Sequence, residues 1–148
     1  MAEAHPVGFQ WVAEAKARGA KLVHVDPRFT RTSAMADKHV HIRAGTDIAL
    51  LGGLIRHMIE NDLWFKEYVT HYSNAAHLVD EGFKDTEDLD GLFSGFDKDT
   101  GDYDKTTWQY EKDPYEADGI AKDMTLQHPR SVFQILKRHY SRYTPEMV

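Results

Sequence analysis

The sequence predicts an α/β fold, and three observations carry this prediction. Two short β-rich runs, residues 21–26 and 39–43, are separated from helical patterns by short links. Apolar residues recur at helical spacing before the first run and after the second. Residues 80–127 lack any such periodicity. Alternating helices and strands with short links are typical of a layered domain built on a parallel sheet.

The first helix is expected to begin at Pro6, because proline suits the first helical turn. Val7, Trp11 and Ala15 would share one of its faces, and Gly19 can end it. Residues 21–26 then fit a buried central strand, which the following proline ends.

The second strand is expected over residues 39–43, after a polar stretch at 28–38. Thr46 or Asp47 can cap the next helix. The apolar face predicted for that helix consists of Ile48, Leu51, Ile55, Met58 and Ile59. A shorter helix over 64–72 completes what we interpret as a partial Rossmann-like layered domain with parallel strands and flanking helices.

The remainder of the chain is expected to be a long irregular excursion followed by a helical return. Asp, Lys, Gly, Thr and Tyr dominate residues 80–127, which is typical of a surface loop with a function or a partner. Pro129 is expected to open the last helix. Thr144-Pro145-Glu146 has the pattern of another helix start. We therefore divide the chain into segments 1–79, 80–127 and 128–148, the last cut at its C-terminus.

Composition excludes several classes of function. The net charge of −6 argues against a nucleic-acid partner. No run approaches the roughly 18 to 20 apolar residues of a membrane span. Residues 1–6 show no signal peptide, which excludes a signal from this stretch alone. The absence of cysteine excludes an all-cysteine iron–sulfur cluster and a thiol nucleophile within these residues.

Asp26 is the first candidate binding residue. In dinucleotide-binding βαβ units, an acidic residue about 20 residues after the phosphate turn accepts hydrogen bonds from the ribose hydroxyls. Asp26 ends the first predicted strand at a comparable distance from the start of the preceding helix. A plain Asp-Pro turn is the alternative interpretation, and the glycine-rich phosphate fingerprint is absent.

The second candidate is Gly45-Thr46-Asp47. Gly45 allows a close approach of main chain to a ligand, and the helix start that follows offers free N–H groups. The Asp47 carboxylate could pair with the N–H and NH₂ edge of a guanine. A simple helix cap is the alternative interpretation.

Metal binding and nucleophilic catalysis find less support. His39 and His41 would share a strand face, with His24 nearby, but zinc usually needs three or four tightly spaced ligands. Residues 97–104 resemble a calcium loop only superficially, and a solvated turn is expected there. We therefore assign no metal ligand and no catalytic residue.

Several stretches of the chain resemble one known family. They are MAEAHPVGF at 1–9, VDPRFTRT at 25–32, AD at 36–37, IRAGTDIA at 42–49, DGLFSGFD at 90–97, LQHPR at 126–130 and SRYTP at 141–145. Together they are similar to the large subunit of respiratory formate dehydrogenases, which are molybdopterin oxidoreductases. The resemblance covers nearly the whole chain, and the excursion and the tail narrow it to this family.

The resemblance implies a subunit that binds molybdopterin guanine dinucleotide around molybdenum or tungsten and oxidises formate to carbon dioxide. Segment 1–79 would bind the dinucleotide, and a [4Fe–4S] cluster would lie elsewhere in the intact subunit. By position, the pyrophosphate side would be held by Met1, Ala2, Glu3 and His5. The ribose side would be held by Asp26, Pro27, Arg28 and Thr30, and the guanine end by Gly45, Thr46 and Asp47.

The resemblance also implies partners and a location. These are the remainder of the same subunit, an iron–sulfur beta subunit and a cytochrome b gamma subunit, in a periplasmic, membrane-associated complex. The family's metal ligand, its cluster cysteines and its catalytic arginine have no counterpart in these residues, so this piece is expected to be inactive in isolation. The alternative is a stand-alone nucleotide-binding or interaction module without redox activity.

Overall fold

The computed structural model describes all 148 residues, which form two compact units, Met1–Leu50 and Leu51–Val148. Helices and a small parallel sheet occur together, so the predicted α/β class is confirmed. None of the helices combines the length and the apolar composition that crossing a bilayer requires. The predicted division into a cofactor-binding segment 1–79, an excursion 80–127 and a helical return 128–148 stays a prediction.

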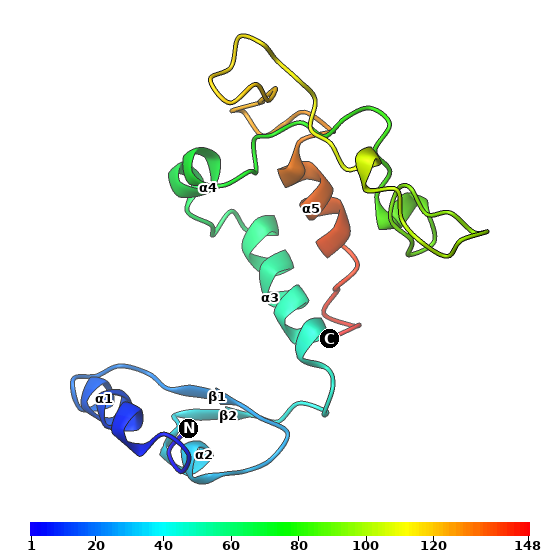
Figure 1. Cartoon of the computed structure of the whole chain (residues 1–148). Helices are drawn as coiled ribbons and strands as arrows, with labels where there is room; N and C mark the ends of the chain where they lie inside the picture. Colours follow the sequence, from blue (N-terminus) through cyan, green and yellow to red (C-terminus); the bar gives the residue numbers. More distant parts are fainter. The chain divides into compact units, whose positions relative to one another are not determined.

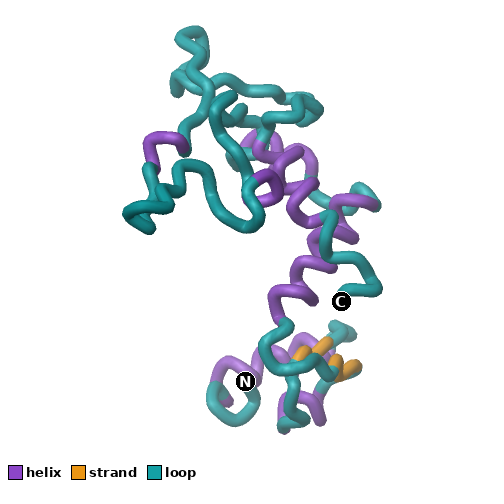
Figure 2. The backbone as a smooth tube through the Cα atoms, turned by 90° about the vertical axis from the view of Figure 1, so that its right-hand side faces the viewer, coloured by secondary structure: helices purple, strands orange, loops and turns teal.

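The first unit contains α1 (Pro6–Ala17), β1 (Val23–Val25), α2 (Arg31–Met35) and β2 (Lys38–Val40). The two strands pair in parallel, with Val23 opposite Lys38 and Val25 opposite Val40. Figure 1 shows α1 and α2 linked to this strand pair by short connections, and Figure 2 shows the strands side by side. Their carboxyl ends therefore lie at one edge of the sheet.

Local chemistry explains where these elements begin and end. Pro6 occupies the first turn of α1, and Gly19 takes a φ of +95° just after the helix, where residues other than glycine are strained. The Asp37 carboxylate accepts hydrogen bonds from the Leu22 N–H and the Lys16 Nζ, both at 2.7 Å. One side chain thus ties α1, the start of β1 and the start of β2 together.

One expectation for the first unit is wrong, and one element was missed. The first strand was expected to be buried, yet Val23 and Val25 are 55% and 41% exposed, because the sheet has only two strands and little covers them. Residues 28–38 were described only as a polar stretch, with no element predicted there, yet α2 lies within them. The Ser33 hydroxyl accepts from the Thr30 N–H and so satisfies a donor at the start of this short helix.

Helix α3 (Asp47–Glu60) begins in the first unit and continues into the second from Leu51. The second unit also contains α4 (Lys66–Tyr72) and α5 (Val132–Tyr140), with 3₁₀ turns η1 (Thr86–Asp88) and η2 (Lys105–Thr107). The excursion between α4 and α5 pairs only through isolated bridges, such as Leu78 with Ser131. Its small core contains Ala75, Ala76 and Leu126, against which Trp64, Val69 and Phe133 pack.

Two expectations for the second unit are also wrong. The last helix begins at Val132, not at Pro129, because the buried Ser131 hydroxyl caps it by accepting from the Gln134 N–H. The apolar face predicted for α3 is largely exposed, with Ile48 and Leu51 at 74% and 56%. The buried residue of α3 is Gly52.

Candidate functional site

The edge of the sheet where both strands end carries the first candidate, Asp26. This residue directly follows β1, and its N–H still donates to the Val40 carbonyl of the neighbouring strand at 3.2 Å. Its carboxylate Oδ1 accepts from the Arg28 N–H at 2.7 Å, across Pro27. The side chain is one-third exposed, and Oδ2 accepts no hydrogen bond, with His24 Nε2 3.7 Å from it.

The N-terminal segment lies beside the chain that follows Asp26. The Met1 and Ala2 nitrogens both donate to the buried Thr32 hydroxyl, at 3.1 and 3.0 Å. A surface hollow of about 540 Å³ is lined by Glu3, Arg28, Phe29, Thr30, Arg31 and Ala34. Glu3 and Arg31 approach to 3.5 Å across it. The structure thus brings together two of the three groups of predicted site residues.

His5 closes the first of these groups. It precedes α1, its N–H donates to the Met1 carbonyl at 2.8 Å, and its carbonyl accepts from the Phe9 N–H at 2.9 Å. The residue itself is exposed. Its main chain therefore joins the Met1–Glu3 turn to the helix.

The third group, Gly45 to Asp47, follows β2. Gly45 has a φ of +84°, which favours glycine, and no atom lies within 4 Å of an added Cβ. The Thr46 hydroxyl donates to the Arg43 carbonyl at 2.7 Å, and Asp47 stands in the first turn of α3. No hydrogen bond or ion pair joins Asp47 to Asp26 or Arg28. The link between this group and the other two is their shared sheet edge.

Two stacked histidines, His24 and His39, lie beside Asp26, and the sequence analysis did not predict their contacts with Ser33 and Asp26. His24 Nδ1 lies 2.9 Å from the Ser33 hydroxyl, and His39 Nε2 lies 2.9 Å from the Asp26 carbonyl. The two rings stack with centroids 5.7 Å apart, and His41 follows at 6.0 Å from His39. The shared strand face was predictable from their spacing, whereas the contacts with Ser33 and Asp26 depend on α2.

The chemistry of these groups suits a ligand with hydroxyl and anionic parts. A carboxylate oxygen can accept from paired hydroxyls, and guanidinium groups such as those of Arg28 and Arg31 bind phosphate oxygens in a fork. Glu3 would oppose an anion at one end of the hollow. This donor set fits the ribose and phosphate portions of a nucleotide.

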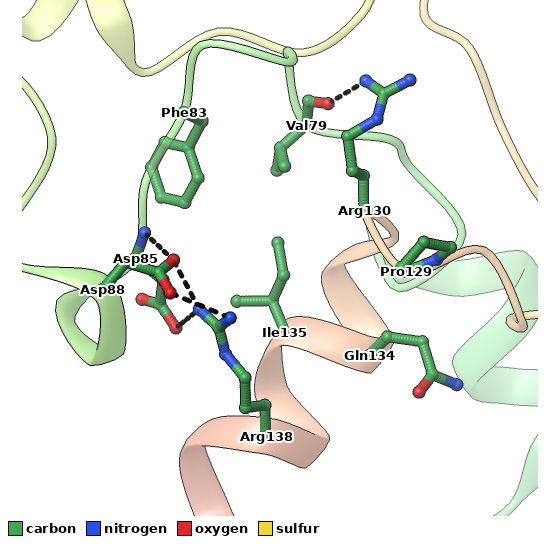
Figure 3. A pocket seen from close by; sticks show the side chains of 9 residues that line it. All are labelled: Val79, Phe83, Asp85, Asp88, Pro129, Arg130, Gln134, Ile135 and Arg138. Atoms are coloured by element: carbon green, nitrogen blue, oxygen red, sulfur yellow. Dashed lines mark hydrogen bonds and ion pairs between the residues drawn. The ribbon is translucent and has the colours of Figure 1, made fainter.

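A second hollow, of about 360 Å³, lies between α5 and η1 in the second unit. Figure 3 shows Phe83 and Ile135 on opposite sides of it, with Arg138 pointing toward Asp85 and Asp88. Arg138 donates to both Asp88 oxygens, at 3.2 and 2.8 Å. These hydrogen bonds raise the pKa of Arg138 and lower the pKa of Asp88.

Close to this hollow, Asp85, Glu87 and His139 place three possible metal-ligand atoms within 4.8 Å of one another. Two arginines form ion pairs with these carboxylates: Arg138 approaches Asp85 Oδ2 at 3.5 Å, although this buried oxygen accepts no hydrogen bond, and Arg142 contacts Glu87. We interpret this cluster as an ionic link between η1 and α5.

Comparisons with known proteins complete the description. No protein-family model matches the chain. The chain is 55% identical over 148 residues to the formate dehydrogenase major subunit of Haemophilus influenzae. It is 52% identical over 149 residues to the nitrate-inducible formate dehydrogenase major subunit of Escherichia coli, and 50% over 142 residues to the formate dehydrogenase subunit alpha of Megalodesulfovibrio gigas. These alignments cover 96–99% of this chain and 14% of each relative.

Proposed function

We propose that residues 1–50 bind part of a molybdopterin guanine dinucleotide. The premise is that this chain belongs to the family of formate dehydrogenase major subunits, and it spans 14% of the length of these relatives. Asp26 would accept from the ribose hydroxyls. Pro27, Arg28 and Thr30 would hold the ribose and its neighbouring groups with it, and Met1 to His5 would line the pyrophosphate side. Gly45 to Asp47 would hold the guanine.

One observation carries this proposal. The Met1 and Ala2 nitrogens donate to Thr32, so the N-terminal segment lies beside the hollow lined by residues 28–31, which follow Asp26 in the chain. A diphosphate needs N–H donors and cations, and a ribose needs an acceptor. The guanidinium groups of Arg28 and Arg31 and the Asp26 carboxylate supply cations and an acceptor directly after a parallel strand, whereas the Ala2 and His5 N–H groups already donate to Thr32 and Met1. Ligands of open α/β sheets bind at that edge.

The finer fold assignment belongs to the same proposal. We infer that α1, β1, α2 and β2 form part of a Rossmann-like layer in a larger subunit. The exposure of Val23 and Val25 supports this, since apolar residues of a parallel strand are normally covered on both faces.

The activity proposed for the whole subunit is the oxidation of formate to carbon dioxide. The cofactor, with molybdenum or tungsten, would supply the two-electron chemistry, and the residues of this chain would bind and orient it. A [4Fe–4S] cluster would be held elsewhere in the subunit, because this chain has no cysteine. The relatives' names describe subunits, which supports an assembly of several subunits. The partners proposed for it are an iron–sulfur beta subunit and a cytochrome b gamma subunit, and the proposed location is a periplasmic, membrane-associated complex.

Nucleotide titration of the full chain tests the binding proposal. GDP should bind, and Asp26→Asn should weaken the binding of GDP and ADP alike, by roughly tenfold for one lost charged hydrogen bond. Asp47→Asn should weaken GDP selectively, because its partner is the guanine edge. Asp99→Asn, an exposed carboxylate in the excursion, is the matched control. Equal affinities for all four proteins, measured by calorimetry, would contradict the assignment.

A further inference from the structure

We propose that His24 and His39 are positioning residues that hold Asp26 from two sides, one through its carboxylate and the other through its main chain. This inference deepens the proposed function, in which Asp26 accepts from the ribose. The histidines themselves touch no ligand in this arrangement. They act through Asp26 and, by way of Ser33, through Thr30.

His39 fixes the main chain of Asp26. A carbonyl oxygen only accepts hydrogen bonds, so the 2.9 Å contact requires the proton of His39 on Nε2. The ring is held in place by stacking on His24 and by an edge contact with Phe29, with centroids at 5.7 and 5.4 Å. His39 therefore anchors the residue at which the strand ends and the binding loop begins.

His24 faces the Asp26 carboxylate, and a chain of hydrogen bonds sets its tautomer. The Ser33 hydroxyl oxygen accepts from the Thr30 N–H at 2.9 Å, and its other hydrogen-bond partner is His24 Nδ1 at 2.9 Å, so its proton has an acceptor when Nδ1 carries none. The proton of neutral His24 is then on Nε2, the atom that lies 3.7 Å from Asp26 Oδ2. The imidazole thus presents an N–H toward the carboxylate.

The hydrogen bonds that link Thr30, Ser33 and His24 are largely shielded from water. Ser33 is 4% exposed, and the His24 side chain is 16% exposed, so water competes weakly for their hydrogen bonds. The Asp26 side chain is 33% exposed and keeps its outer lone pairs for a ligand. The same relay joins Thr30 to Asp26, two residues assigned to the ribose side of the nucleotide. A change at His24 should therefore disturb both contacts.

Nitrogen-15 NMR of the full chain tests the positioning directly, without any ligand. Both His24 and His39 should show the neutral tautomer protonated on Nε2 at pH 8. Ser33→Ala should remove the preference at His24 and leave His39 unchanged. A tautomer protonated on Nδ1 at either residue of the wild-type chain would overturn the inference.

GDP affinity then separates positioning from ring packing. His39→Phe keeps an aromatic ring but loses the donor, so affinity should fall roughly three- to tenfold, as for one hydrogen bond. His39→Gln, whose amide nitrogen has a reach similar to that of Nε2, should restore most of this loss. His24→Phe should weaken GDP to a similar extent, and His41→Phe, in the same stack but without a hydrogen bond to Asp26 or Ser33, is the control.

The two hypotheses fail in different ways. If the wild-type chain binds no nucleotide, the proposed function is refuted, and the tautomers still decide the geometry around Asp26. If the wild-type chain binds GDP but His24→Phe and His39→Phe bind it equally well, the positioning role is refuted and the nucleotide site stands. Loss of binding in His39→Gln as severe as in His39→Phe would likewise refute the role of the donor.

Discussion

The aromatic ring of Tyr143 lies against the main chain of Gly52, so closely that a Cβ added to this glycine would lie 2.6 Å from ring carbon Cγ. Gly52 is the buried residue of α3, whereas Ile48 and Leu51 on the same helix are exposed. A glycine, which loses about 1 kcal/mol relative to alanine inside a helix, is retained where the ring packs. The Tyr143 ring therefore packs on α3 in the space that a side chain at position 52 would occupy.

Gly52→Ala is expected to destabilise the second unit. The clash involves a ring and not a flexible chain end, and overpacking costs about 1–3 kcal/mol. Gly53→Ala is the matched control, because its Cβ would come within 2.8 Å of Cγ2 of Val148, a half-exposed residue that can shift more easily than a packed ring. That variant should gain up to about 1 kcal/mol from helix propensity. Urea unfolding measures both, and a more stable Gly52→Ala would contradict the packing described here.

Asp123 is expected to stabilise the turn before α5. Its two oxygens accept from the Thr125 hydroxyl and from the N–H groups of Thr125, Gln127 and His128, at 2.6–2.9 Å. Asp123→Ala should cost about 1–2 kcal/mol at pH 7. Asp102→Ala, whose carboxylate accepts from the Tyr103 N–H alone, should cost less. Equal losses in urea unfolding would show that the cluster of hydrogen bonds carries no extra stability.

The same carboxylate predicts an acid-sensitive step. The hydrogen bond from Thr125, followed by that from His128, lowers the pKa of Asp123 from 3.8 to about 2. A group with a depressed pKa in the folded state stabilises the fold above its unfolded pKa and loses this contribution as pH falls through the folded pKa. The stability difference between wild type and Asp123→Ala should therefore shrink between pH 4 and about 2. A difference that persists unchanged at the acid end would refute this cause.

Except for α2, the order of the elements up to α4 was accessible from the sequence because local signals agree with the fold. Pro6 and Gly19 bracket α1, and the spacing of the two β-rich runs gave a parallel pair. Burial was not accessible from the same signals. A period of apolar residues marks a face but does not say whether this chain covers it, and in α3 that face stays exposed.

The candidate site divides in the same way. Asp26 is recognisable because it ends a strand, and its assignment as a ribose ligand stays a prediction. The histidine pair was seen only as a possible metal cluster, since spacing places His39 and His41 on one face. Their partners depend on α2, whose start is secured by Ser33 rather than by the more familiar Glu or Gln at that position.

Ser131 is expected to decide where α5 begins. Its side chain is fully buried, its hydroxyl accepts from the Gln134 N–H at 3.3 Å, and its own N–H donates to the His128 carbonyl. Ser131→Ala removes the cap and leaves a helix donor without a partner, so a loss of about 1 kcal/mol is expected. Ser141→Ala, at the exposed opposite end of the helix, should change the stability by less than about 0.5 kcal/mol. Thermal unfolding that does not distinguish the two variants would contradict this role.

Arg138 is expected to hold the excursion onto α5 through its two-pronged contact with Asp88, fifty residues earlier in the chain. Arg138→Gln should raise hydrogen exchange of the amides around η1, and Arg138→Lys should restore only part of the protection, because an ammonium cannot make the planar fork. The partners are partly exposed, so 1 M salt should erase most of the difference from wild type. Because Arg138 lowers the pKa of Asp88, the protection should be present at neutral pH and weaken as that carboxylate is protonated in acid. Lys137→Gln removes a neighbouring charge that forms no ion pair and is the control; exchange around η1 that rises equally in both variants would show that net charge, and not the fork, holds the excursion.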